Sequence, residues 1–175
     1  RQLCLALEIV IRKFPQTVLH VYGRDWKDAH GQSYLSFLKS QLKSETLDHI
    51  VFHGPVDQKD LPGIYAKANC CIFPSHIETL GLVAPEAMAM KRPVIYTSIG
   101  PGPEVVDHGI SGWLCDPHNP KSIALQIIDV FSNPIEMQKR AIAGQKKVNS
   151  QFNIENILPQ NLEFYQEVID LKTVR

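Results

Sequence analysis

The chain has 175 residues, in which 18 Lys plus Arg balance 18 Asp plus Glu, so its formal net charge is 0. A hydrophobic fraction of 44% and a charged fraction of 21% are typical of a globular domain with one sizeable core. This balance gives no reason to expect nucleic-acid binding, which normally requires a basic excess. No stretch approaches the roughly 20 apolar residues of a membrane-spanning helix, and no signal peptide is recognisable.

The opening residues fit two patterns. Alternating Leu and Ile side chains suggest a strand, whereas four apolar residues have the spacing of a helix face, namely Leu3, Leu7, Val10 and Phe14. We favour the helix, because Pro15 and the strand-like residues 17–22 follow and require an element that leads into a strand. A chain that opens on a helix implies that a first strand lies upstream of Arg1.

Five short apolar runs predict strands, at residues 17–22, 49–53, 69–73, 93–97 and 112–115. Amphipathic stretches predict helices at 33–43, after an N-cap at Asp60, and at 81–91, 121–131, up to 149, and 155–171. This alternation predicts an α/β fold, a Rossmann-like doubly wound parallel sheet flanked by helices. Residues 1–175 are expected to form one such domain.

The cysteines and histidines do not have the spacing of metal ligands. No C-x-x-C pair occurs, and Cys70 and Cys71 lie in an apolar run, so we expect buried, reduced thiols in a cytoplasmic protein. His49 and His53 are four residues apart, which on a strand is roughly 13 Å, too far to share a metal ion. We therefore predict no metal site.

A pair of basic dipeptides, Lys139-Arg140 and Lys146-Lys147, falls in a predicted helix. Such a pattern most simply indicates a solvated helix face. It also leaves open a peripheral contact at the cytoplasmic face of a membrane.

The most informative segment is 74–90, P-S-H-I-E-T-L-G-L-V-A-P-E-A-M-A-M. It follows the most apolar predicted strand and leads into a helix, the position at which open α/β sheets bind ligands. Pro85 fits only the opening turn, which places the helix start near residues 80–82. The N–H groups of Gly81, Leu82 and Val83 then lack intrahelical partners and are suited to hold a diphosphate.

Two carboxylates flank this turn, Glu78 before the helix and Glu86 inside it. A carboxylate can accept hydrogen bonds from two adjacent hydroxyls, so one acid is suited to a sugar and the other to a ribose. The simpler alternative is a solvated loop Glu, a first-turn Glu favoured by the helix dipole, and an ordinary turn glycine at Gly81. Ser75 either caps the following segment or touches the ligand.

This segment resembles the E-x7-E signature of retaining glycosyltransferases with the GT-B fold, especially glycosyltransferase family 4. The match comprises Ser75, Glu78, Gly81-Leu82-Val83 and Glu86-Ala87-Met88-Ala89, with Leu80 where the family often has an aromatic residue. Segments 20–23, 51–56, 92–95, 100–106 and 108–117 are also similar to the family in order, so the resemblance covers nearly the whole chain.

The resemblance implies the C-terminal, donor-binding domain of a two-domain enzyme, in which Glu78 contacts the donor sugar and Glu86 the ribose. The implied donor-binding residues are Gly23, Pro55, Val56, Ser75, Thr79, Leu80, Gly81, Leu82 and Val83. The family's Arg and Lys pair has no matching Arg-x4-Lys pattern in this chain.

The implied donor is a UDP- or GDP-sugar, with no cofactor or metal required. A missing N-terminal domain would hold the acceptor, a glycan, a lipid-linked molecule or a small molecule. The helical segment at about 153–171 either docks on this domain or crosses to the missing one. Two alternatives remain, a nucleotide-sugar epimerase of similar fold and a non-catalytic nucleotide-binding module.

Overall fold

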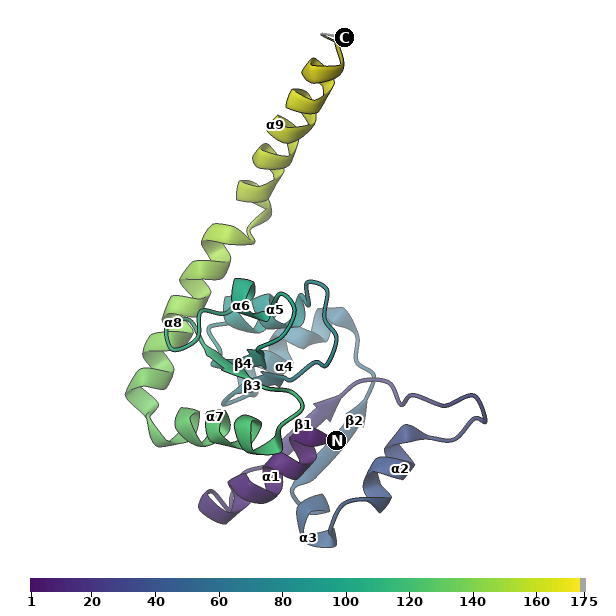
Figure 1. Ribbon diagram of the computed structural model, residues 1–175. Coiled ribbons are helices and arrows are strands. Elements are labelled where there is room, and N and C mark those ends of the chain that lie inside the picture. Colours follow the sequence, from purple (N-terminus) through teal and green to yellow (C-terminus); the bar gives the residue numbers. More distant parts are fainter. Residues whose placement is uncertain (174–175) are drawn as a thin grey trace.

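The computed structural model describes residues 1–173 and has an α/β architecture with parallel strands between helices (Figure 1). All five predicted strands are confirmed, each within two residues of the expected bounds. They are β1 Leu19–Tyr22, β2 Ile50–Gly54, β3 Cys71–Phe73, β4 Val94–Thr97 and β5 Trp113–Cys115.

The predicted helices are confirmed in order, with some changes in length, and two further short helices, Ser44–Leu47 and Gly102–Val105, were not predicted. In chain order the helices are α1 Gln2–Lys13, α2 Tyr34–Ser40, α3 Ser44–Leu47, α4 Leu61–Lys67, α5 Val83–Ala89, α6 Gly102–Val105, α7 Pro120–Ser132, α8 Pro134–Gln151 and α9 Ile154–Thr173, with a 3-10 turn at Gln58–Asp60. The helix expected at 33–43 is shorter, because α2 ends at Ser40, and the separate helix α3 begins only after the predicted range. The helix expected at 81–91 begins two residues later and ends two residues earlier.

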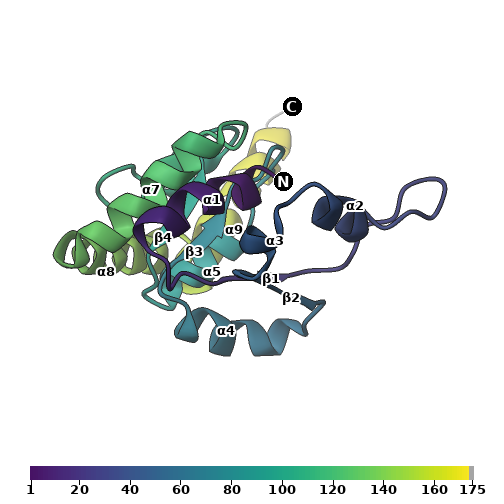
Figure 2. The ribbon, with the colours of Figure 1, turned by 90° about the horizontal axis from the view of Figure 1, so that it is seen from below.

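The opening segment is a helix, as predicted, because its apolar residues follow helical spacing. Leu7 is 3% exposed and Val10 is fully buried. Arg12 and Lys13 lie in the last turn of α1, where positive charge is favourable. The helix packs against α7, and Figure 2 shows the two side by side.

The strands form two parallel sheets, ordered β1-β2 and β3-β4-β5. Within the described residues the two sheets are not paired with each other, so β1 and β3 each have one unpaired edge. The chain passes from one sheet to the other through α4. In doubly wound folds, ligands bind where the chain crosses between the two groups of parallel strands.

Helices cover both faces of the β3-β4-β5 sheet. On one face, Ile95 and Trp113 pack with residues of α1 and α7 such as Val10 and Ile127. On the other face, a cluster from α4, α5, α6 and α8 packs on β3 and β4, and it includes Tyr65, Met88, Tyr96, Val105 and Val148. All four residues of β4 are buried, as expected for a central strand covered on both faces.

The β1-β2 sheet is covered on one face only. Ile50 packs with Leu7, Leu38 and other residues of α1 and α2. The opposite face carries Val18, Tyr22 and Val51, which are 47%, 37% and 41% exposed. This sheet therefore has an uncovered face within the described part of the chain.

The basic helix face expected on α8 is only partly solvated. Arg140 pairs with Asp129 at 3.4 Å and lies over the Trp113 ring at 4.6 Å. Lys147 pairs with Asp107 at 2.8 Å, with 11% of its side chain exposed. Half of the expected basic face is therefore used in packing, and the solvated-face interpretation is wrong for these two residues.

The last helix, α9, projects away from the rest of the molecule (Figure 1). Leu158, Leu162 and Tyr165 are 51%, 59% and 60% exposed. In this structure the stripe is therefore not docked on its own domain. In the described part of the chain, no helix combines the length and apolar character required to cross a membrane.

Candidate functional site

The segment singled out in the sequence forms the loop between β3 and α5. It leaves the sheet at Phe73, the carboxyl end of β3, and enters α5 at Val83, with Leu82 as the N-cap residue. Pro85 lies in the first turn, as expected, because its missing N–H has no intrahelical partner to lose. Both candidate acids are thus positioned at the carboxyl end of a parallel sheet.

Gly81 is required by the geometry of this loop. Its φ is +60°, a left-handed conformation that side chains with a Cβ rarely adopt. A Cβ at this position would lie 2.6 Å from the carboxyl carbon of Glu78 and would also clash with the Tyr96 hydroxyl. A side chain at position 81 would therefore require the Glu78 carboxyl and the Tyr96 hydroxyl to move, and it would also strain the backbone.

Glu78 is half-buried within this loop. Its Oε1 accepts a hydrogen bond from the backbone N–H of Thr79 at 3.0 Å. The Tyr96 hydroxyl, at the far end of a fully buried side chain, donates to the Leu80 carbonyl at 3.4 Å. Burial, with a contribution from the nearby charge of Glu78, raises the pKa of Tyr96 to about 12, so this phenol stays protonated beneath the loop.

Glu86 lies in the first turn of α5 and is also half-buried. Its Oε2 accepts a hydrogen bond from the Tyr65 hydroxyl at 3.1 Å. Tyr65 belongs to α4 and is 6% exposed, so the phenol reaches the carboxylate from within the core. Burial first, and then the bond to Glu86, raises the pKa of Tyr65 well above its ordinary value.

The amides at the end of the loop are free to bind a ligand. Within the described residues, the N–H groups of Gly81, Leu82 and Val83 donate no hydrogen bond, whereas Ala84 already donates to the Gly81 carbonyl at 3.3 Å. Because α5 has only seven residues, its dipole contributes less than the longer predicted helix would. The unbonded N–H groups of the loop, more than the helix dipole, are therefore the feature of this site that is suited to bind an anion.

A second loop, after β4, supports the first. Gly100 has φ +60°, and a Cβ there would lie 3.3 Å from the Glu78 carbonyl oxygen. Gly102 is buried against the carbonyl of Thr97, with no room for a side chain. The two loops therefore pack backbone to backbone at the same edge of the sheet.

The candidate base-binding residues lie at the carboxyl ends of β1 and β2. The Gly23 N–H donates to the Gly54 carbonyl at 2.8 Å, while Pro55 and Val56 are exposed. In the described residues no hydrogen bond or ion pair joins this group to the β3–α5 loop. The structure thus places the two groups at corresponding strand ends of separate sheets.

Three rings stack beside these strand ends. His53 stacks between His20, at a centroid distance of 5.1 Å, and Tyr22, at 4.3 Å. A hydrogen bond of 2.8 Å joins the ring nitrogens His20 Nδ1 and His53 Nε2. His49, the residue directly before β2, bonds instead to the Thr17 carbonyl.

The β3–α5 loop, which carries the acid Glu78, itself exposes several apolar side chains. Ile77 is 91% exposed, and Leu80, Leu82 and Val83 are 46%, 58% and 36% exposed. Thr79 is also exposed, and Ser75 is half-buried. Contiguous exposed apolar side chains of this kind commonly mark an interaction surface.

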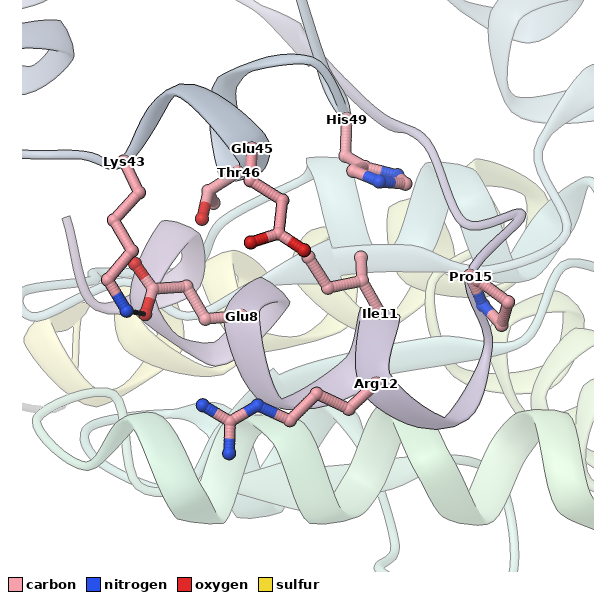
Figure 3. Close-up of a pocket in the computed structure, with 8 residues that line it drawn as sticks. All are labelled: Glu8, Ile11, Arg12, Pro15, Lys43, Glu45, Thr46 and His49. Carbon is pink, nitrogen blue, oxygen red and sulfur yellow. Dashed lines mark hydrogen bonds and ion pairs between the residues drawn. The ribbon is translucent and has the colours of Figure 1, made fainter.

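Two pockets lie elsewhere in the molecule. A pocket of about 140 Å³ between α1, α3 and the start of β2 is lined by charged side chains including Glu8, Arg12, Lys43 and Glu45 (Figure 3). A second, of about 300 Å³, lies near Arg92 and Met137. Both lie away from the β3–α5 loop. Among the described residues there is no cluster of three His, Cys, Asp or Glu residues that could hold a metal ion.

This chain is similar in sequence and in fold to known proteins. The family model described as glycosyl transferases group 1 matches residues 1–148. Glycogen synthase from Mycobacterium tuberculosis is 28% identical over 164 residues, which are 91% of this chain and 37% of that protein. The chain thus spans well under half the length of this relative.

Solved structures agree with the fold. Sucrose-phosphate synthase from Thermosynechococcus elongatus superimposes with a TM-score of 0.81 at 27% identity, over 98% of this chain and 43% of that one. HepE from Anabaena, in complex with UDP-glucose, gives 0.83 at 24% identity over 95% and 44% of the two chains. The architecture is that of one Rossmann-like half of a GT-B fold. With a family model that matches most of its length, this chain belongs to the glycosyl transferases group 1 family.

Proposed function

We propose that this chain is the nucleotide-sugar-binding domain of a retaining glycosyltransferase of the family 4 type. The observation that carries the proposal is the β3–α5 loop, which brings three unbonded amides between Glu78 and Glu86 at the carboxyl end of the sheet. This arrangement occurs in a member of a glycosyltransferase family, at the segment that resembles the family's acidic signature.

Each part of the loop has a proposed role. Glu86 accepts hydrogen bonds from the ribose hydroxyls, and Glu78 from hydroxyls of the donor sugar. The amides of Gly81, Leu82 and Val83 meet the diphosphate, where backbone donors offset the charge of the leaving group. Gly23, Pro55 and Val56 border the base, while Ser75, Thr79 and Leu80 line the approach to the sugar.

The donor is proposed to be a UDP- or GDP-sugar, bound without a metal ion or cofactor. HepE, which has the same fold, was solved in complex with UDP-glucose, and this supports a nucleotide diphosphate sugar as the donor class. Carboxylates placed directly on a diphosphate would repel it, so hydroxyl recognition is the role that suits both acids.

The acceptor is proposed to bind a second, N-terminal domain outside this chain. The exposed apolar residues Ile77, Leu80 and Leu82 beside the site give such a domain a surface to face. The projecting helix α9 is suited to cross to the same domain through Leu158, Leu162 and Tyr165.

Titration calorimetry of this chain with a nucleoside diphosphate and with the matching nucleotide sugar tests the roles of the two acids. Glu86→Ala is expected to weaken both ligands, because each carries the ribose, whereas Glu78→Ala weakens only the sugar-bearing one. Each loss should be about 1–3 kcal/mol, or roughly 5- to 150-fold in Kd. Glu155→Ala, an exposed carboxylate on α9, is the control.

An unchanged affinity of Glu86→Ala for the nucleoside diphosphate would contradict the ribose assignment. The same donor, labelled in its sugar and given to the protein together with its acceptor domain, separates transfer from its alternatives. Transfer yields a labelled acceptor, an epimerase yields a labelled epimer, and a binding module leaves the donor unchanged.

A further inference from the structure

We propose that Tyr65 is a positioning residue, which fixes the carboxylate of Glu86 so that the ribose hydroxyls of the donor meet it already oriented. This inference rests on the proposed function, because it assigns a support to the acid that grips the ribose.

The hydrogen bond between Tyr65 and Glu86 joins a core residue to the candidate site. Tyr65 lies on α4 and Glu86 on α5, two helices that pack against each other on the same face of the sheet. The Tyr65 hydroxyl donates to Glu86 Oε2 at 3.1 Å. Since Glu86 is half-buried and Tyr65 is 6% exposed, the bond links the ligand side of α5 to the interior.

The tyrosine ring is itself held in place. It meets the Phe73 ring edge-on, with centroids 6.4 Å apart and planes at 85°. Phe73 is the last residue of β3, directly before the acid-bearing loop. A hydroxyl on a ring fixed in this way is a donor at one defined point, which restricts the torsion angles of the Glu86 side chain.

This restriction serves binding in two ways. A glutamate side chain loses rotamer freedom when it grips a ligand, and a contact that orders it beforehand removes part of that cost. An ionised carboxylate can accept about four hydrogen bonds, so a bond at Oε2 leaves Oε1 available to a diol. Burial keeps the Tyr65 phenol protonated, so it remains a donor at any ordinary working pH.

Tyr65→Phe removes the hydroxyl and keeps the ring, so the core packing with Phe73 is retained. We expect the variant to bind uridine or guanosine diphosphate roughly 3- to 30-fold more weakly by calorimetry. Its affinity for the 2′,3′-dideoxy form of the same nucleotide should stay at the wild-type value, because that ligand has no hydroxyl for Glu86 to hold. Tyr34→Phe, which removes a phenol from α2, is the control and should leave both affinities unchanged.

A double-mutant cycle tests whether Tyr65 acts through Glu86. In a Glu86→Gln background the added Tyr65→Phe change should have little further effect on ribonucleotide affinity, since the orientated carboxylate is already lost. Full additivity of the two changes would overturn the proposal.

The outcomes distinguish a failure of the Glu86 contact with the ribose from a failure of the positioning role of Tyr65. If the wild-type chain does not distinguish the ribonucleotide from its dideoxy form, the ribose grip of Glu86 and the proposed role of Tyr65 both fail. If it does distinguish them and Tyr65→Phe binds both ligands as the wild type does, only the positioning role fails. Equal weakening of both ligands would mean that Tyr65 supports the fold and not the acid, and would also overturn the proposal.

Discussion

At the scale of single residues, Gly81 determines whether the β3–α5 loop can adopt the conformation seen in the structure. Its φ of +60° is unfavourable for any residue with a Cβ, and the site of that Cβ is already occupied by the Glu78 carboxyl and the Tyr96 hydroxyl. Gly81→Ala is therefore expected to displace Glu78 and to weaken the sugar-bearing donor by about 1–3 kcal/mol, as measured by calorimetry. The melting temperature should fall as well, because the left-handed backbone becomes strained.

Gly63→Ala is the matched control for this change. Gly63 lies inside α4 with open space around its Cα, so alanine should stabilise the helix by roughly 0.5–1 kcal/mol. A Gly81→Ala protein that binds the nucleotide sugar as tightly as the Gly63→Ala protein would show that the loop adapts and that glycine is not needed there.

The two acids could be found in the sequence, but the tyrosines behind them could not. Glu78 and Glu86 stand out because they flank a glycine and a proline that fix the start of a helix. Tyr65 does not stand out as a core residue in the sequence, although Leu61, Tyr65 and Ala68 have helical spacing. That its hydroxyl meets Glu86 depends on how α4 packs on α5, and sequence spacing carries no information about that contact.

At the scale of elements, α8 holds α5 in place through a close approach at Gly144. A Cβ there would lie 2.6 Å from the Ser111 carbonyl oxygen and 3.3 Å from the Met88 side chain of α5. Gly144→Ala should therefore destabilise the chain by about 1–3 kcal/mol through overpacking, measured by urea denaturation. The opposite sign expected for Gly63→Ala makes the pair informative, and a stabilised Gly144→Ala protein would contradict this packing.

The long apolar side chains of α9 should contribute little to the stability of this chain. Leu158 and Leu162 are about half exposed, so replacing both with Gln, which retains helix propensity, should change the unfolding free energy by less than about 0.5 kcal/mol per site. Leu7→Ala, at a residue of α1 that is 3% exposed, should cost about 2–5 kcal/mol. A loss of that size from the α9 pair would mean that the helix packs on the body in solution.

The order of the helices and strands was predictable wherever the pattern of apolar residues lay within a single segment. The helix at the start was recognised from Leu7 and Val10 at helical spacing, and β3 from the unbroken apolar run at residues 70–73. The exact length of α5 was not, because its end depends on Lys91, which adopts a positive φ of 56° that no propensity anticipates. Whether α9 docks or projects depends on what surrounds it, and its apolar stripe fits both arrangements.

At the scale of the whole molecule, three layers of helix, sheet and helix bury several groups that can lose a proton at high pH. None of the four cysteines forms a disulfide, and Cys71 and Cys115 are buried in the two cores beside β4. Burial raises the pKa of Cys71 to about 11 and that of Cys115 to about 12. The Tyr96 phenol is shifted in the same direction, to about 12.

The sign of the effect on stability follows from these shifts. A raised pKa means that the folded state favours the protonated form, so the contribution is fully present below the unfolded pKa of about 8.5 for a thiol and about 10 for a phenol. As the pH rises above those values the unfolded chain loses protons that the folded chain retains. Each group then lowers the unfolding free energy by about 1.4 kcal/mol per pH unit, until the pH reaches its folded pKa.

We therefore expect the urea midpoint of this chain to be constant from about pH 7 to 8 and to fall steadily between about pH 9 and 11. Cys71→Ala should start from a lower stability at pH 7, because it leaves a cavity, yet decline less steeply with pH, because one buried thiol is gone. Comparing the two slopes separates this thiol from other groups that titrate at high pH, such as lysines. Identical slopes for the two proteins would show that Cys71 ionises as readily in the fold as in the unfolded chain, and would contradict a raised pKa for this thiol.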